Sequence, residues 1–103
     1  SQGFPDFPLD GRLIELVNKA MQEGFNQYAP MPGWPALRQV ISEVIEKTYT
    51  INVNPETEIT VTAGGTQALF AIFQSLFSKE DEVLVLDPSY DSYRPAIELS
   101  GAK

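Results

Sequence analysis

The 103-residue chain contains no cysteine and no histidine. Without cysteine it has neither a disulfide framework nor thiolate chemistry. Without histidine it lacks the commonest general base and metal ligand. No apolar run is long enough to cross a bilayer and no secretory leader is visible, so we expect the cytoplasm as the compartment. Any site must therefore rest on other residue types, and we expect no metal.

The acidic balance of the chain limits its partners. Fourteen Asp and Glu residues against seven Lys and Arg residues give a net charge of -7. This charge argues against nucleic acid and anionic membranes as partners, and solubility is a sufficient reason for it. Apolar residues make up 43% of the chain and charged residues 20%, which is ordinary for one soluble domain with a modest core.

One stretch in the middle of the chain has the pattern of an anion site. Residues 59–62, Ile-Thr-Val-Thr, are β-branched and predict a strand. Gly64 and Gly65 allow a tight turn and a close approach of ligand to backbone, and Thr66 is the expected N-cap of the helix that follows. The unpaired N–H groups of such a helix start suit an anion, most simply a phosphate. An ordinary strand–helix connection is the competing interpretation.

Two amphipathic helices are predicted before this stretch. Asp10 caps the first helix, which ends at Gly24, and Pro35 begins the second. Core packing is a sufficient reason for both. The segment between them is irregular but rich in large apolar side chains: Phe25, Tyr28, Met31 and Trp34. We interpret it as an interface or a site wall, with core packing as the alternative.

The second half of the chain predicts an α/β fold. Residues 68–77 form a helix that is apolar on nearly every side, which belongs inside a larger body than this chain can easily build. Residues 83–86, Val-Leu-Val-Leu, predict a strand that is covered on both faces. Strand, helix and strand over about thirty residues make a βαβ unit. A short helix over 95–100 is expected to end at Gly101.

Tyr90 follows the second predicted strand. In open parallel sheets, ligands bind beyond the carboxyl ends of the strands. The glycine turn and Tyr90 both lie at such ends, so together they suit a flat, phosphorylated, ring-shaped ligand. A partly buried loop aromatic is the alternative for Tyr90.

Four segments, in the right order, resemble those of pyridoxal-phosphate-dependent aminotransferases of fold type I, class I and II. They are residues 3–7 (Gly-Phe-Pro-Asp-Phe), 26–30 (Asn-Gln-Tyr-Ala-Pro), 62–69 (Thr-Ala-Gly-Gly-Thr-Gln-Ala-Leu) and 87–93 (Asp-Pro-Ser-Tyr-Asp-Ser-Tyr). The resemblance is greatest to the branch that contains the methionine aminotransferases and the kynurenine/glutamine transaminases.

The resemblance implies roles for the turn and for Tyr90. Residues 64–67 would hold the phosphate of pyridoxal 5'-phosphate, with Gly65 and Thr66 binding through backbone N–H groups. Tyr90 would stack its ring on the pyridine. Many relatives carry Ala and Glu where this chain has Gly65 and Gln67. A backbone contact survives the first difference, whereas the role of Gln67 follows less directly.

It also implies roles outside the turn. Tyr28 would reach the phosphate bound to the neighbouring subunit of a homodimer. Gly3 would contribute a backbone contact to the substrate carboxylate, with Phe4 near the substrate. Residues 1–8 would lie at the junction of the small and large domains. Residues 9–103 would form the first part of the large cofactor-binding domain, whose mostly parallel sheet is flanked by helices.

The resemblance implies that the reaction centre lies outside this chain. Such enzymes use a Schiff-base lysine, an acidic partner for the pyridine nitrogen and an arginine for the substrate carboxylate. No lysine here has the expected context, and the chain stops where another strand is due. We therefore expect an inactive N-terminal fragment of an aminotransferase that moves an amino group from an amino acid to a 2-oxo acid. The alternatives are a carbon–sulfur lyase on the same fold and a non-catalytic fragment or dimerisation module.

Overall fold

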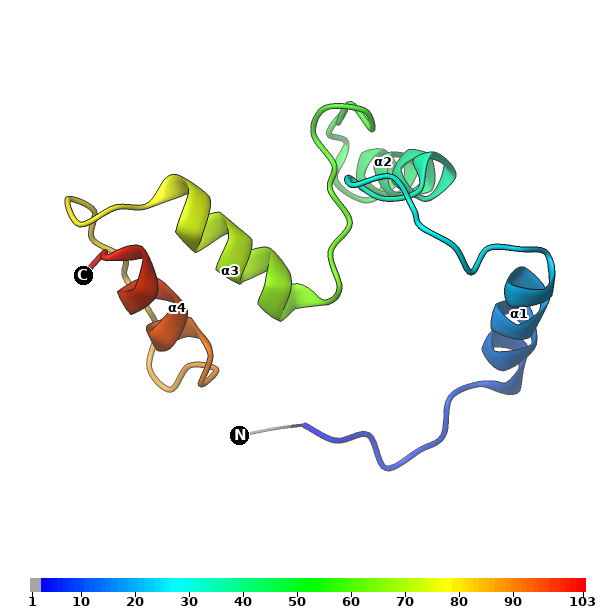
Figure 1. The fold of residues 1–103 in the computed structure, drawn as a ribbon, viewed down its shortest axis with the longest axis horizontal. Coiled ribbons are helices and arrows are strands. Elements are labelled where there is room, and N and C mark those ends of the chain that lie inside the picture. The colour runs from blue at the N-terminus through cyan, green and yellow to red at the C-terminus, as the bar shows by residue number, and fades with distance from the viewer. Residues whose placement is uncertain (1–2) are drawn as a thin grey trace.

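A computed structural model describes residues 3–103, and the regular structure of this part consists of four helices. They are α1 (Gly11–Gln22), α2 (Pro35–Tyr49), α3 (Gly65–Leu76) and α4 (Tyr93–Ser100). Figure 1 shows α1 and α2 on one side of the molecule and α3 and α4 on the other. The extended chain between α2 and α3 joins the two sides.

The ends of the first two helices follow the predicted signals. The Asp10 carboxylate accepts a hydrogen bond from the backbone N–H of Arg12 at 2.9 Å, which confirms the N-cap of α1. Gly24, just beyond the last turn of α1, has a φ of +92°. Pro35 is the first residue of α2, where its missing N–H costs nothing.

The last two helices pack against each other and hold the small core. The side-chain amide of Gln74 on α3 donates to the carbonyl of Ala96 on α4 at 2.9 Å. The buried apolar residues are Ala96, Ile97 and Ala102. Gly101 ends α4 with a φ of +88°, as predicted. The helix begins at Tyr93, two residues before the predicted start.

The predicted sheet is not present in residues 3–103. Residues 59–62 and 83–86 are without regular structure because a strand needs a neighbouring backbone as partner. The nearest approach to a sheet is at residue 82. The N–H of Val83 donates to the carbonyl of Lys103 at 2.8 Å, and the N–H of Lys103 donates to the carbonyl of Asp81 at 3.1 Å. This pair of bonds has the pattern of a parallel bridge.

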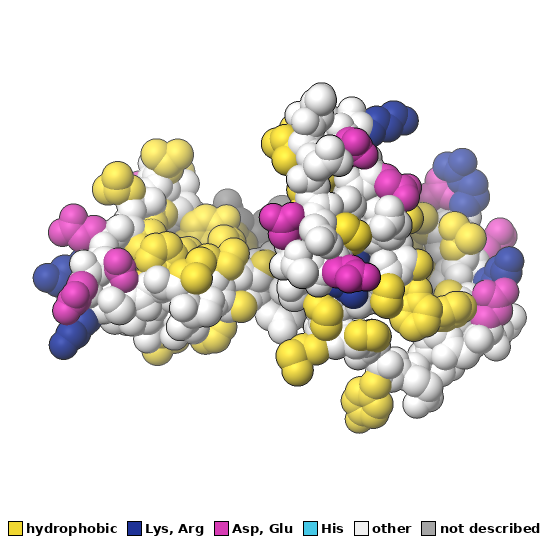
Figure 2. Space-filling model, turned by 90° about the horizontal axis from the view of Figure 1, so that it is seen from above, with side chains coloured by type: hydrophobic (Ala, Val, Ile, Leu, Met, Phe, Trp, Pro, Cys, Tyr) yellow, Lys and Arg dark blue, Asp and Glu magenta, His cyan; other side chains and the backbone are white. Residues whose placement is uncertain are grey.

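The molecule is open, and much apolar surface is uncovered. Its radius of gyration is 17.3 Å, whereas a compact chain of this length has about 13 Å. The accessible surface is 9075 Å², against about 5,800 Å² for a compact monomer of this mass. Figure 2 shows apolar side chains on both sides of the molecule. On α3, Leu76 is 71% exposed, which agrees with a helix too apolar for this chain to cover.

Candidate functional site

The glycine turn begins with a backbone conformation that favours glycine. Gly64 has a φ of +94° and is the N-cap of α3. The sequence predicted Thr66 as the cap, but Thr66 is the second residue of the helix. The prediction was wrong because the positive φ of Gly64 starts the helix two residues earlier. The Thr62 hydroxyl donates to the Gly64 carbonyl at 3.0 Å, and the Gly64 N–H donates to the Thr62 carbonyl at 2.9 Å.

Gln67 braces the turn from inside the first turn of α3. Its side-chain oxygen accepts a hydrogen bond from the N–H of Ala63 at 2.6 Å. A Gln at the third helical position that reaches back to an N–H before the helix is close to a capping box. The spacing from Gly64 to Gln67 is the sequence signal for this role. In the described chain, Gln67 therefore acts on the turn itself.

Three backbone donors point out of the start of α3 without a partner in residues 3–103. They are the N–H groups of Gly65, Thr66 and Gln67, whereas the N–H of Ala68 donates to the Gly64 carbonyl at 3.3 Å. A Cβ added at Gly65 would meet no atom within 4 Å, so the space at the turn is open. Free N–H groups and the positive end of the helix dipole together attract an anion. The turn thus has the donors of a phosphate site.

Tyr90 lies beside the helix that the turn begins. A cavity of about 520 Å³ is lined by Leu69 and Phe73 of α3, by residues 83–86, and by Tyr90 and Tyr93. Tyr90 is 40% exposed. Its ring centroid is 5.9 Å from that of Tyr93, the first residue of α4. Leu69 is one turn along α3 from Gly65, and the residues of the glycine turn do not themselves line this cavity. That Tyr90 and the turn bind one ligand stays a prediction.

Tyr28 lies in the irregular loop and not at the turn. Phe25 and Trp34 close the base of this loop, with ring centroids 5.4 Å apart at 87°. Tyr28 is fully exposed and Met31 is 96% exposed. A cavity of about 330 Å³ runs along Tyr28 and Trp34. One aromatic pair of the loop thus packs within the chain, whereas Tyr28 is fully exposed.

The N-terminal segment also remains apart from the turn. Phe4 is 94% exposed, and Gly3 is exposed as well. A Cβ added at Gly3 would meet no atom within 4 Å. Within the described residues, neither residue has a hydrogen bond to the turn or to Tyr90.

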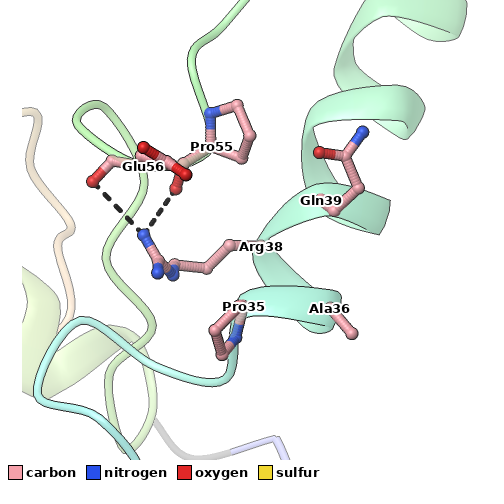
Figure 3. A pocket seen from close by; sticks show the side chains of 6 residues that line it. All are labelled: Pro35, Ala36, Arg38, Gln39, Pro55 and Glu56. Carbon is pink, nitrogen blue, oxygen red and sulfur yellow. Dashed lines mark hydrogen bonds between the residues drawn. The ribbon is translucent and has the colours of Figure 1, made fainter.

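A buried arginine in a second cavity was not predicted from the sequence. Arg38 is only 8% exposed and lines a cavity of about 530 Å³ with residues of α2 and of the loop after it. Its guanidinium donates to the carbonyls of Pro55 and Glu56, at 2.6 and 3.3 Å. Figure 3 shows these two bonds as dashed lines. One turn further along α2, the Ser42 hydroxyl donates to the Val53 carbonyl at 2.6 Å. Helix α2 thus holds the loop that leads toward the turn.

The groups with a shifted pKa are Asp10 and Arg12, at the beginning of α1. Asp10 has a pKa below its ordinary value because the Arg12 side chain and backbone donate hydrogen bonds to it. The four lysines lie at the ends of α1 and α2, in the turn at 79–80 and at residue 103. Residues 3–103 contain no group of three acidic side chains placed to hold a metal ion. None of the helices in that range is long and apolar enough to cross a membrane.

Comparisons with known proteins agree on one family. The sequence profile of aminotransferase class I and II matches residues 1–103. The chain is 50% identical over 101 residues to the methionine aminotransferase of Escherichia coli, covering 98% of this chain and 26% of that protein. It is 34% identical to human kynurenine–oxoglutarate transaminase 1, covering 99% of this chain and 25% of that protein. The chain therefore spans about a quarter of the length of these relatives.

Solved structures show the same backbone. The crystal structure of YbdL from Escherichia coli, described with a methionine aminotransferase function, matches with a TM-score of 0.93 at 49% identity. That match covers 99% of this chain and 27% of YbdL. The N-succinyldiaminopimelate aminotransferase of Mycobacterium tuberculosis matches with a TM-score of 0.90 at 38% identity, covering 98% of this chain and 26% of that one. The described chain thus has the fold of the corresponding part of a fold type I aminotransferase, and it belongs to the aminotransferase class I and II family.

Proposed function

We propose that the full-length protein containing this segment is a pyridoxal-phosphate-dependent aminotransferase that moves an amino group from an amino acid to a 2-oxo acid. The observation that carries the proposal is the start of α3, where three backbone N–H groups have no partner in residues 3–103 and the space at Gly65 is open. The 50% identity to a methionine aminotransferase supports the same activity.

The residues of the turn fit the phosphate of the cofactor. A phosphate dianion needs several donors and no competing side chain, and the N–H groups of Gly65, Thr66 and Gln67 meet both needs. Gly64 shapes the turn through its positive φ. When bound, pyridoxal phosphate supplies an electron sink that stabilises negative charge on the substrate carbon next to the amino group. The chain described here orients this group through its phosphate.

Tyr90 fits the ring of the cofactor. Its aromatic face borders a cavity of about 520 Å³ whose remaining wall includes Leu69 and Phe73. Aromatic rings prefer offset stacking on one another, so Tyr90 would hold the pyridine plane. The apolar side chains of α3 would exclude water from that side of the ring. Tyr93, 5.9 Å away, would keep the Tyr90 ring from turning.

Three further residues have roles in this proposal that come from the resemblance. Tyr28 would reach the phosphate of the neighbouring subunit in a homodimer, and its full exposure leaves it free to do so. Gly3 would bind the substrate carboxylate through its backbone, with Phe4 beside the substrate. Both are exposed and have room for a ligand.

The proposal includes the domain plan and the surroundings of the segment. Residues 1–8 would join the small and large domains, and residues 9–103 would begin the large cofactor-binding domain. In the full-length protein, residues 59–62 and 83–86 would become strands of a mostly parallel sheet. The parallel pair of hydrogen bonds around residue 82 supports this expectation. We expect the protein to act in the cytoplasm.

The experiment is a transfer assay on the purified full-length protein. Absorbance measures whether pyridoxal phosphate stays bound after dialysis, and a panel of amino acids is then incubated with 2-oxo acids. We expect retained cofactor and a new amino acid formed in equal amount to the amino donor consumed. Failure to retain the cofactor, or absence of transfer across the panel, would overturn the proposal.

The same assay separates transfer from elimination. A carbon–sulfur lyase would release a thiol and ammonia from a sulfur-containing amino acid without need of a 2-oxo acid. We expect consumption of methionine or other donors to depend on the added 2-oxo acid and to release no thiol. Thiol release without the 2-oxo acid would favour the lyase.

A further inference from the structure

The loop that carries Tyr28 crosses the chain that leads into the turn. The N–H of Val61 donates to the carbonyl of Pro32 at 2.9 Å. A Cβ added at Gly33 would lie 2.7 Å from the Cβ of Val61 and 2.8 Å from its Cγ2. Contacts this short do not occur in folded proteins, so the two segments cross at a point where only glycine fits. The φ of Gly33 is +101°, which also favours glycine.

The crossing is close along the chain to the candidate phosphate site. Val61 directly precedes Thr62, whose hydroxyl and carbonyl both bond to Gly64. Consecutive Cα atoms are about 3.8 Å apart and the peptide units are planar, so a shift at Val61 moves Thr62 with it. The positions of the free N–H groups at the start of α3 therefore depend on where Val61 lies.

The crossing is held from both sides. On one side, Gly33 donates from its N–H to the carbonyl of Pro30 at 2.8 Å, which closes a tight turn over residues 30–33. On the other side, Trp34 leads directly into α2 and packs on Phe25. The backbone at Pro32 and Gly33 is thus held in place, and Val61 packs against it.

We propose that Gly33 is a positioning residue for the phosphate turn. By lacking a side chain, it lets the Pro32 carbonyl reach the N–H of Val61, and this contact sets the place of residues 62–67. The inference rests on the proposed function, since it names a residue that acts on the phosphate through the turn. Gly33 itself does not contact the ligand.

The test compares two ligands that differ in the phosphate alone. Dissociation constants for pyridoxal phosphate and for pyridoxal are measured on the full-length protein freed of cofactor. Their ratio reports the contribution of the phosphate contacts, which a general loss of stability would not change selectively. In Gly33→Ala, we expect the affinity for pyridoxal phosphate to fall by about tenfold, the size of one hydrogen bond to a charged group, with little change for pyridoxal.

Gly24→Ala is the matched control. Gly24 also has a positive φ, +92°, yet a Cβ there would meet no atom within 4 Å. The control therefore introduces the same kind of backbone strain without the clash at Val61. We expect its ratio of dissociation constants to match that of the unaltered protein. An unchanged ratio in folded Gly33→Ala, or an equal loss for both ligands, would overturn the inference.

A second variant decides the matter if Gly33→Ala does not fold. Val61→Ala removes the methyl groups of the side chain that packs against Gly33. It keeps the N–H that donates to the Pro32 carbonyl. We expect a smaller selective loss for pyridoxal phosphate, and no selective loss in Val40→Ala, a half-exposed valine of α2. Identical ratios in Val61→Ala and Val40→Ala would refute the positioning role. An unaltered protein that binds neither ligand would instead refute the proposed function.

Discussion

The side chain of Gln67 supports the glycine turn, a role that the sequence indicates only through the spacing from Gly64 to Gln67. Its side-chain oxygen accepts a hydrogen bond from the Ala63 N–H at 2.6 Å, so this N–H is not available to an anion. The N–H groups of Gly65, Thr66 and Gln67 have no partner within residues 3–103. The Gln67 side chain, whose role the resemblance left less direct, thus supports the turn in the described chain. The backbone N–H of Gln67 has no partner within residues 3–103 and is the group that we propose for the phosphate.

Replacing Gln67 tests this bracing role. Gln67→Ala should lower the free energy of unfolding of the full-length apoprotein by about 1 kcal/mol, the typical worth of one hydrogen bond. Gln67→Glu keeps an acceptor for the Ala63 N–H and should retain the stability. Chemical denaturation measures both. The control is Gln39→Ala, whose amide bonds to the exposed Glu43 side chain. Equal stability of Gln67→Ala and the control would contradict the role.

Thr66 shows where residue preferences mislead. Threonine is a good N-cap and glycine is a weaker one, so the sequence favours Thr66 as the cap. The observed cap is Gly64, because its φ of +94° turns the chain into the helix before Thr66 is reached. Backbone freedom decided this boundary over side-chain capping. The free N–H of Thr66 is present in either case.

At the scale of helices, α1 and α2 agree with the sequence signals at their beginnings. Asp10 and Pro35 are local signals that act within one turn, so they do not depend on the rest of the fold. The burial of Arg38 depends instead on a loop seventeen residues further along. Nothing in the helical periodicity distinguishes it from a solvated arginine.

The Asp10 cap predicts a pH effect. The hydrogen bond from the Arg12 side chain, and then the one from its backbone, lower the pKa of Asp10 in the folded chain. A lowered pKa means that the carboxylate contributes stability above its ordinary pKa. That contribution is lost as the pH falls through the lower, folded value. We expect α1 to loosen in acid within that window.

Titration of the Asp10 carboxyl carbon by NMR measures the effect directly. Its midpoint should lie below the ordinary aspartate value and move back toward it in Arg12→Gln, which lacks the charged donor. Added salt should reduce the difference, because the pair is exposed. A midpoint that is the same in both proteins would show that Arg12 does not hold the carboxylate.

Arg38 predicts a stability effect at the level of α2. Arg38→Met keeps the apolar stem but removes the donor for the Pro55 and Glu56 carbonyls. We expect the free energy of unfolding of the full-length protein to fall by about 1–3 kcal/mol. Arg12→Met, at an exposed arginine, should lower it much less. Denaturant titration compares the two, and similar values would contradict a structural role for Arg38.

At the scale of the whole molecule, the described chain exposes far more surface than a compact protein of its mass. Leu84 and Leu86 are 100% and 91% exposed, and they lie in a segment that the sequence predicts as a covered strand. The apolar pattern thus predicts a strand that is covered on both faces, and residues 3–103 do not themselves provide that cover. A strand of this kind needs a partner on each edge and cover on each face.

The 103-residue chain by itself should therefore behave poorly in water. We expect it to bind a hydrophobic dye strongly and to associate at micromolar concentration, because contiguous apolar patches promote association. Dye fluorescence and light scattering measure both properties, with the full-length protein as the control. A monodisperse chain with little dye binding and a cooperative unfolding transition would favour the independent module over the enzyme segment.

The sequence by itself determined the four helices, the beginnings of α1 and α2, the end of α4 and the place of the glycine turn before α3, because these depend on local backbone and capping preferences. The four ordered motifs also predicted the family. Only the tertiary structure decided which donors at the turn remain free, that Arg38 is buried, and that Gly33 lies against Val61. These features arise between residues far apart in the chain, and hydrophobic periodicity carries no information about such contacts. The sheet depends on the same kind of contact, so an apolar run alone could not form it.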